Sequence, residues 1–175
     1  ASDVYKRQEN VSEKSHKQSN INEKYGQIDS ISGSAMFFCT KIFDKNEGFD
    51  ENFFLYFEET DYCYRSNKNN YKIFQVNSQR VQHDIGTSVE TTSEDEANKF
   101  KDLYTWHFIW SKFYFTKKKK GYILSLFILA PILLRTIIKM IYYKGIRNTL
   151  QEKHYQIRLD GLLSSIKGQK SNKRP

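Results

Sequence analysis

The chain has 175 residues, enough for one domain of ordinary size or for part of a larger one, and 38% of them are hydrophobic and 15% aromatic. The net charge of +8 is divided unevenly, with −6 over residues 1–98 (11 basic, 17 acidic) and +14 over residues 99–175 (17 basic, 3 acidic), which indicates two surfaces with different partners. The two cysteines form no CxxC pair, which argues against a disulfide framework or a zinc site and predicts free, buried thiols in a reducing compartment.

Residues 1–27 are polar and rich in Ser, Asn, Lys and Glu, and we interpret them as a disordered or surface lead-in. Ser2–Gln8 looks like a translated sequencing adapter, so we expect part of this lead-in to be artefactual and the chain to be a piece of a longer protein. Ordered structure is expected from Ile28 onward.

Short elements are predicted over the acidic half. Ser34–Thr40 is an apolar run behind a Ser-Gly-Ser turn, which predicts a buried strand, and residues 41–47 predict one helical turn. A helix is predicted from Phe54 to Asn67. The alternation of Tyr71–Val76 predicts a strand, and Arg80–His83 predicts a second extended piece.

The basic half predicts helices. Residues 89–98 are acidic and rich in Ser and Thr, which predicts a mobile loop, and the aromatic stretch Lys99–Phe115 predicts a helix. Residues 151–175 are predicted to be a basic tail with a short helical remnant at Asp160–Leu163 and a disordered end.

An aliphatic segment follows the lysine run Lys117–Lys120. The fourteen residues Gly121–Leu134 hold no charge, and the apolar pattern continues past Arg135 and Lys139 to Tyr143. An uncharged run of that length falls short of the roughly 20 residues that span a bilayer, and its basic flank favours an interfacial or shallowly inserted helix. The alternative is a buried core helix, or one that docks on a missing part of the chain.

The segment Gly48–Arg65 contains five acidic and seven aromatic residues in eighteen positions. On a helix Glu58 and Asp61 share a face, and Glu59 points sideways from both. Clustered carboxylates permit three uses: a general base, part of a divalent-metal site, or a solvated helix start that favours the macrodipole. Asp61 and Arg65 are also spaced i, i+4, so an ion pair is an alternative use of Asp61.

Few other residues suggest chemistry. His83 ends an extended segment before a Gly86 turn, where a side chain can project into a cleft, although a lone histidine is more often structural. The sequence has no Gly-rich phosphate loop and no DxD motif. The lysines adjoin an aliphatic run rather than interleaved aromatics, which favours anionic lipid over nucleic acid as a partner.

Four motifs occur together: Ser32-Gly-Ser-Ala-Met-Phe-Phe38, Gly48-Phe-Asp-Glu-Asn-Phe-Phe54, Tyr56-Phe-Glu-Glu-Thr-Asp-Tyr-Cys-Tyr-Arg65, and Val81-Gln-His83 with Gly86 and Ser88. In this order they resemble the C-terminal half of family 2 glycosyltransferases, especially the rhamnosyltransferase-like enzymes of bacterial cell-surface polysaccharide assembly. The resemblance covers residues 28–115, and more loosely the helical segment 116–150 and the tail 151–175.

The resemblance implies the C-terminal part of a nucleotide-diphospho-sugar transferase fold, an α/β class, followed by aliphatic helices. It implies that Glu59 is the base that deprotonates an acceptor hydroxyl, with Asp61 and Glu58 as alternatives, because Glu58-Glu59-Thr60-Asp61 stands where the family most often has Glu-Asp-x-Asp. His83 would help to hold Mg²⁺ or Mn²⁺. The implied acceptor-binding residues are Gly33, Ser34, Asp50 and Glu51.

The resemblance also implies partners. It predicts a nucleotide-sugar donor and a glycan or lipid-linked acceptor. The basic-aliphatic pattern adds an anionic membrane surface and no nucleic acid, so we expect a location at the cytoplasmic face of the cell membrane. Because the nucleotide-binding half with its DxD motif is not in the sequence, we expect the parent protein to be an inverting glycosyltransferase and the isolated chain to be inactive. The alternative is a non-catalytic membrane-surface protein that uses the basic-aliphatic helix.

Overall fold

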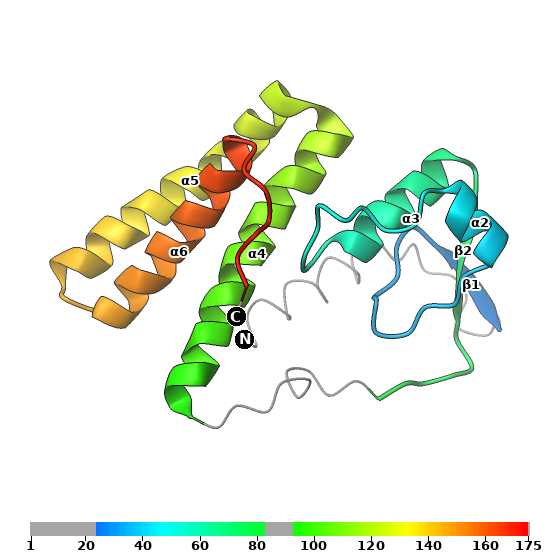
Figure 1. Ribbon diagram of the computed structural model, residues 1–175, viewed down its shortest axis with the longest axis horizontal. Coiled ribbons are helices and arrows are strands. Elements are labelled where there is room, and N and C mark those ends of the chain that lie inside the picture. The colour runs from blue at the N-terminus through cyan, green and yellow to red at the C-terminus, as the bar shows by residue number, and fades with distance from the viewer. Residues whose placement is uncertain (1–23, 83–92, 175) are drawn as a thin grey trace. The chain divides into compact units, whose positions relative to one another are not determined.

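A computed structural model describes residues 24–82 and 93–174 (Figure 1). The chain forms two compact units: unit 1 holds the described residues 24–50 and 58–82, and unit 2 holds residues 51–57 and 93–174. The described chain is mostly helical with one two-stranded sheet, so the predicted α/β class is only loosely compatible with it.

Unit 1 contains the sheet and two helices. Strand β1 (Tyr25–Ile28) pairs antiparallel with β2 (Ile73–Val76), and the register places Tyr25 opposite Val76. The strand predicted at 71–76 is confirmed in β2, whereas β1 lies inside the segment that was predicted to precede ordered structure. Helices α2 (Thr40–Lys45) and α3 (Glu58–Lys68) complete the unit, and α2 confirms the predicted helical turn.

The buried strand predicted at Ser34–Thr40 is wrong. Phe37 is fully exposed, and Phe38 packs instead against the rings of Phe43, Phe49 and Tyr62, whose centroids lie 5.0–5.7 Å from its own. The apolar run therefore feeds a local aromatic cluster and needs no partner strand. No strand forms at residues 80–82, and His83, which ended that predicted extended piece, lies outside the described residues.

Helix α3 begins at Glu58, four residues after the predicted start at Phe54. Tyr56 and Phe57 have φ angles of 67° and 72°, and this left-handed region cannot be continued into a right-handed helix. Two consecutive bulky residues in that region are unusual, because each costs about 1–3 kcal/mol of strain. The backbone immediately before the acidic helix start is thus held in a strained conformation.

Unit 2 is built on three long helices: α4 (Glu94–Lys120), α5 (Tyr122–Gly145) and α6 (Thr149–Ile166). The predicted loop at 89–98 is wrong for residues 94–98, because Ser93 caps α4 by accepting a hydrogen bond from the Glu96 amide at 3.2 Å. The core joins Ile109 and Phe113 of α4 to Leu129 of α5 and Leu162 of α6.

The tail is more ordered than predicted. Instead of a short remnant at 160–163, α6 runs for 18 residues, because it approaches α4 closely at Gly161. Asp160 accepts hydrogen bonds at 2.8 Å from the Trp106 indole and at 2.7 Å from Lys173. Tertiary packing on α4 therefore orders a sequence whose own pattern is weakly helical.

Residues 167–174 are not disordered, contrary to the prediction. They continue along α4, where Trp110 donates its indole N–H to the Gln169 carbonyl at 3.0 Å. Buried His107 donates from Nε2 to the Lys173 carbonyl (3.0 Å), and its Nδ1 accepts from the Ser171 hydroxyl (2.9 Å). Burial lowers the pKa of His107, so the neutral ring holds the tail in place.

The aromatic segment 51–57 belongs to unit 2 and packs on α4. The Leu55 carbonyl accepts a hydrogen bond from the Ser111 hydroxyl at 2.9 Å, and Phe53 packs edge-on against Tyr114 with centroids 4.9 Å apart. Phe57 contacts both Phe108 and Phe115. The aromatic residues that precede the acidic cluster are thus part of the helical core.

The close approach at Gly161 gives a test of unit 2. A Cβ at this position would lie 2.7 Å from the Trp106 carbonyl oxygen, so we expect Gly161→Ala to lower the free energy of unfolding by about 2 kcal/mol or more. Because both tryptophans are in α4, fluorescence during urea unfolding reports this unit.

Gly145→Ala is the matched control, since nothing lies within 4 Å of its added Cβ and the residue ends a helix. It should be neutral or stabilising by up to about 1 kcal/mol. Equal behaviour of the two variants would contradict the assigned packing.

Candidate functional site

The candidate site lies at the start of α3 in unit 1. Glu58 and Glu59 occupy the first turn, where backbone amides have no partner within the helix and the macrodipole favours negative charge. Two effects therefore oppose each other, since the helix start stabilises a carboxylate and burial destabilises it. The surroundings of the three acidic side chains differ.

Desolvation has the largest effect on the pKa of Glu59. Its pKa is raised from the ordinary 4.5 to about 7, first by burial and then by the negative charge of Glu58, and the amides of Glu59 and Thr60 offset only part of this rise. Glu59 therefore exchanges a proton near neutral pH. A carboxylate with this property is a candidate general base.

Glu58 is shifted in the same direction. Burial raises its pKa, and its Oε2 is buried with no hydrogen-bond partner among the described residues. A buried carboxylate oxygen without a partner is unusual in a folded protein, and a bound proton, a water molecule or a ligand group would satisfy it. Glu58 and Glu59 thus form a pair in which charge on one opposes charge on the other.

The loop that contains Gly33 faces Glu59. A Cβ added to Gly33 would lie 3.7 Å from both Cβ and Cγ of Glu59, so Gly33 lies beside the Glu59 side chain. The Cys63 thiol, one turn further along α3, interacts with Ser30 and the Ile31 backbone, and burial raises its pKa. Residues 30–33 therefore run along one side of α3.

Asp61 has a different environment. Its side chain is fully buried, and its Oδ2 lies 2.8 Å from Arg65 Nε. The same guanidinium donates to the Gly48 carbonyl at 2.6 Å and to the Asn46 carbonyl. The predicted ion pair is confirmed, with Asp61 buried and Arg65 partly exposed, and it gives Asp61 a structural role in joining α3 to the segment after α2.

Asn46 extends this network. It is buried, donates to the Ser66 hydroxyl at 2.8 Å and accepts from Asn69 at 2.8 Å. Sequence reasoning missed Asn46, Ser66 and the bridging function of Arg65, because their partners are about 20 residues away in the sequence. Gly48, with φ of 54°, supplies the turn that presents its carbonyl to Arg65.

The other predicted acceptor-binding residues have separate surroundings. Ser34 is exposed and bonds with Ser32 through its hydroxyl at 3.2 Å, and Asp50 is half-buried at the end of the first part of unit 1. Glu51 is exposed and belongs to unit 2. His83 lies outside the described residues. Gly33, a predicted acceptor-binding residue, lies against Glu59.

The two cysteine thiols differ in exposure. Cys63 is buried and free as predicted, whereas Cys39 is free but exposed. Within residues 24–82 and 93–174, no group of three His, Cys, Asp or Glu side chains is arranged to hold a metal ion. The predicted ligand His83 is not among the described residues.

Comparison of the sequence with protein-family models and curated proteins, and of the fold with solved structures, finds no match.

The buried ion pair can be tested through α3 stability. Asp61→Asn leaves the Arg65 charge without its carboxylate, so we expect the free energy of opening α3 to fall by about 3 kcal/mol. Amide hydrogen exchange in α3 measures this locally. The exposed Lys68→Gln on the same helix is the control and should change it by less than about 0.5 kcal/mol. A similarly small effect of Asp61→Asn would contradict the structural role.

Glu59 makes the stability of unit 1 depend on pH. Its pKa is higher folded (about 7) than unfolded (about 4.5), so the folded state binds the extra proton and stability falls as pH rises from about 4.5 through 7. We expect Glu59→Gln to remove this dependence and to stabilise α3 at pH 8 by about 2 kcal/mol. Hydrogen exchange at pH 5 and pH 8 compares the variants, with exposed Glu47→Gln as control.

Proposed function

We propose that this chain carries the acceptor-side half of an inverting glycosyltransferase that uses a nucleotide-diphospho-sugar donor, with Glu59 as general base. The observation that carries the proposal is the half-buried Glu59 carboxylate at the start of α3 beside Gly33, whose pKa of about 7 suits a base at neutral pH. The order of the four sequence motifs, with the acidic motif opening a helix, supports the same assignment.

The chemistry requires one proton transfer and one substitution. Glu59 takes the proton from an acceptor hydroxyl, and the oxygen attacks the anomeric carbon of the donor sugar from the side opposite the diphosphate. The new glycosidic bond forms as the bond to the nucleotide diphosphate breaks, so the configuration inverts and the diphosphate leaves with the bonding electron pair. In the complete enzyme, Mg²⁺ or Mn²⁺ would stabilise that leaving charge.

The surroundings of Glu59 suit a base that must meet a sugar hydroxyl. Glu58 raises the proton affinity of Glu59, because two negative charges on neighbouring carboxylates repel each other. Gly33 presents no side chain beside the carboxylate. Asp61 is held by Arg65 and has a structural role in supporting α3. These features favour Glu59 over Glu58 and Asp61 as the base.

The wider assignments belong to the same proposal. The nucleotide-diphospho-sugar transferase fold, the cell-envelope glycan or lipid-linked acceptor, and the bacterial polysaccharide pathway are supported by the motif resemblance over residues 28–115. The β1–β2 pair and α3 are the described elements that would contribute to such a fold.

The experiment uses a longer chain that includes an upstream nucleotide-binding half and follows release of nucleoside diphosphate. We expect Glu59→Gln to lower kcat/KM by about 10²–10⁴, because loss of a general base has effects of that size. In the parent enzyme kcat/KM should rise with pH and level off above about 7, since the deprotonated carboxylate is the active form.

Glu47→Gln, an exposed acid in the same unit, should leave the rate unchanged. The 175-residue chain alone should release no diphosphate. A near-normal rate for Glu59→Gln would assign the base to another residue, and robust turnover by the isolated chain would refute the half-site assignment.

A further inference from the structure

Helix α5 has one apolar face that no part of the described chain covers. Ile123, Phe127, Leu134, Ile138 and Ile141 recur at helical spacing, and their exposed fractions run from 57% to 73%. The opposite side is buried at Ser125, Leu129 and Thr136. An outward strip of this length exceeds the scattered apolar residues that are normal on a soluble surface, and it marks an interaction site.

The charge around this face selects its partner. From Lys117 to Gln151 the sequence has eight Lys or Arg residues and no Asp or Glu. Four of these are the consecutive lysines that end α4, directly before α5. Tyr122 and Tyr142, both about half exposed, mark the two ends of the apolar strip. Apolar side chains flanked by lysines and tyrosines match the boundary between acyl chains and anionic headgroups.

Helix α5 is long enough to span a bilayer, because its 24 residues extend about 36 Å and its most apolar 18-residue window has a mean hydropathy of 2.0. The neighbouring helix α6 argues against a spanning orientation of α5. Tyr122 bonds with the Ile166 carbonyl at 3.2 Å, and Tyr143 stacks on Tyr155, so α6 runs antiparallel along α5 (Figure 1).

A spanning α5 would therefore carry α6 into the hydrocarbon core. That helix contains Glu152, Lys153, Arg158 and Asp160, and α5 itself has Arg135 and Lys139 in its second half. Ionised side chains are costly at membrane depth. With α5 in the plane of the interface, its apolar strip reaches the acyl chains while α6 stays on the aqueous side.

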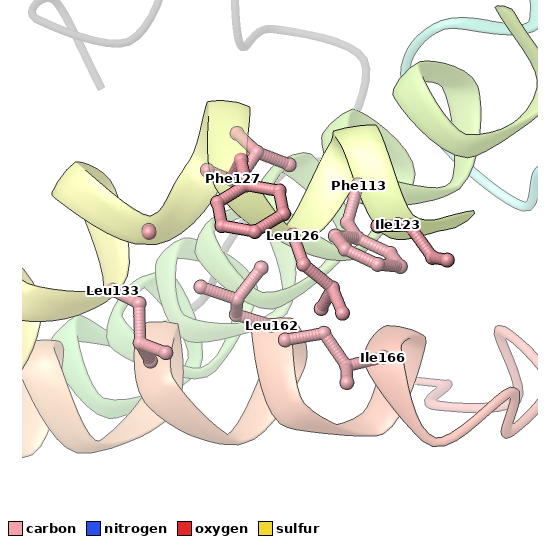
Figure 2. Close-up of a pocket in the computed structure, with 9 residues that line it drawn as sticks. Phe113, Ile123, Leu126, Phe127, Leu133, Leu162 and Ile166 are labelled. Carbon is pink, nitrogen blue, oxygen red and sulfur yellow. The ribbon is translucent and has the colours of Figure 1, made fainter. Parts of the chain in front are cut away.

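An apolar cavity lies next to this exposed face. It has a volume of about 440 Å³ and lies among α4, α5 and α6, with Phe113, Leu129 and Leu162 in its lining (Figure 2). Ile123 and Phe127 line it as well, and both belong to the outer strip. The cavity is therefore continuous with the exposed face and can accept part of an acyl chain.

From these observations we propose that α5 docks in the plane of an anionic lipid bilayer, with its outer strip among the acyl chains and Lys117–Lys120 at the headgroups. This partner is assigned from unit 2 alone and does not depend on the proposed chemistry of Glu59.

The test is sedimentation of the full chain with vesicles of phosphatidylcholine alone or mixed with 30 mol% phosphatidylglycerol. We expect binding to the mixed vesicles that weakens with salt. Replacing Lys118, Lys119 and Lys120 by Gln should weaken it by about fivefold per lysine, roughly 100-fold in all. Phe127→Asp should abolish binding, whereas Phe37→Asp, at a fully exposed Phe in unit 1, should not. Circular dichroism checks that both Asp variants fold.

Orientation is tested with a membrane-impermeant maleimide in a Cys39→Ser background, using Lys120→Cys and Lys144→Cys at the two ends of α5. In-plane docking predicts that both thiols react from outside the vesicle. Protection of one end would show a spanning helix and overturn the proposal. Equal binding to neutral vesicles, absence of vesicle binding, or self-association lost in Phe127→Asp would overturn the choice of an anionic bilayer as partner.

Discussion

The Asp61–Arg65 ion pair is the constraint on which the candidate site depends. Arg65 places one guanidinium between the Asp61 carboxylate and the carbonyls of Asn46 and Gly48, so a single side chain fixes α3 against the segment that follows α2. Buried charge is tolerated only where geometry and hydrogen bonding offset desolvation, and three acceptors around one guanidinium meet that condition. With α3 fixed, its first turn lies beside the Gly33 loop.

The same helix start shows how environment divides chemically similar residues. Asp61 is paired with Arg65, which commits it to the fold. Glu59, two positions earlier, is desolvated beside Glu58, so the proton remains available for exchange near neutral pH. A base needs that availability, whereas a structural carboxylate does not. The strained φ angles at Tyr56 and Phe57 are the local cost of starting α3 at Glu58.

Local pattern predicted the elements whose own sequence determines them, and failed where distant packing decides. The α2 turn, β2 and the aliphatic α5 follow from punctuation and periodicity. The predictions for Ser34–Thr40 and for the length of α6 failed because distant contacts decide both segments. Phe38 packs in an aromatic cluster instead of a strand, and Gly161 allows α6 to approach α4 closely. At the site, the sequence located the three acidic residues but did not show which of them could act as a base. The desolvation of Glu59 and the ion pair between Asp61 and Arg65 are visible only in the structure.

Unit 2 explains why the outer face of α5 remains open. Helix α4 is the shared partner: it packs against the aromatic segment 51–57, the tail residues 169–173, α6 and the inner face of α5. Ile109, Phe113, Leu129 and Leu162 form the buried core, and Phe127 and Ile138 are not members of it. The outer strip lies outside this core, and its position beside a stretch with eight basic and no acidic residues supports the proposed anionic lipid partner.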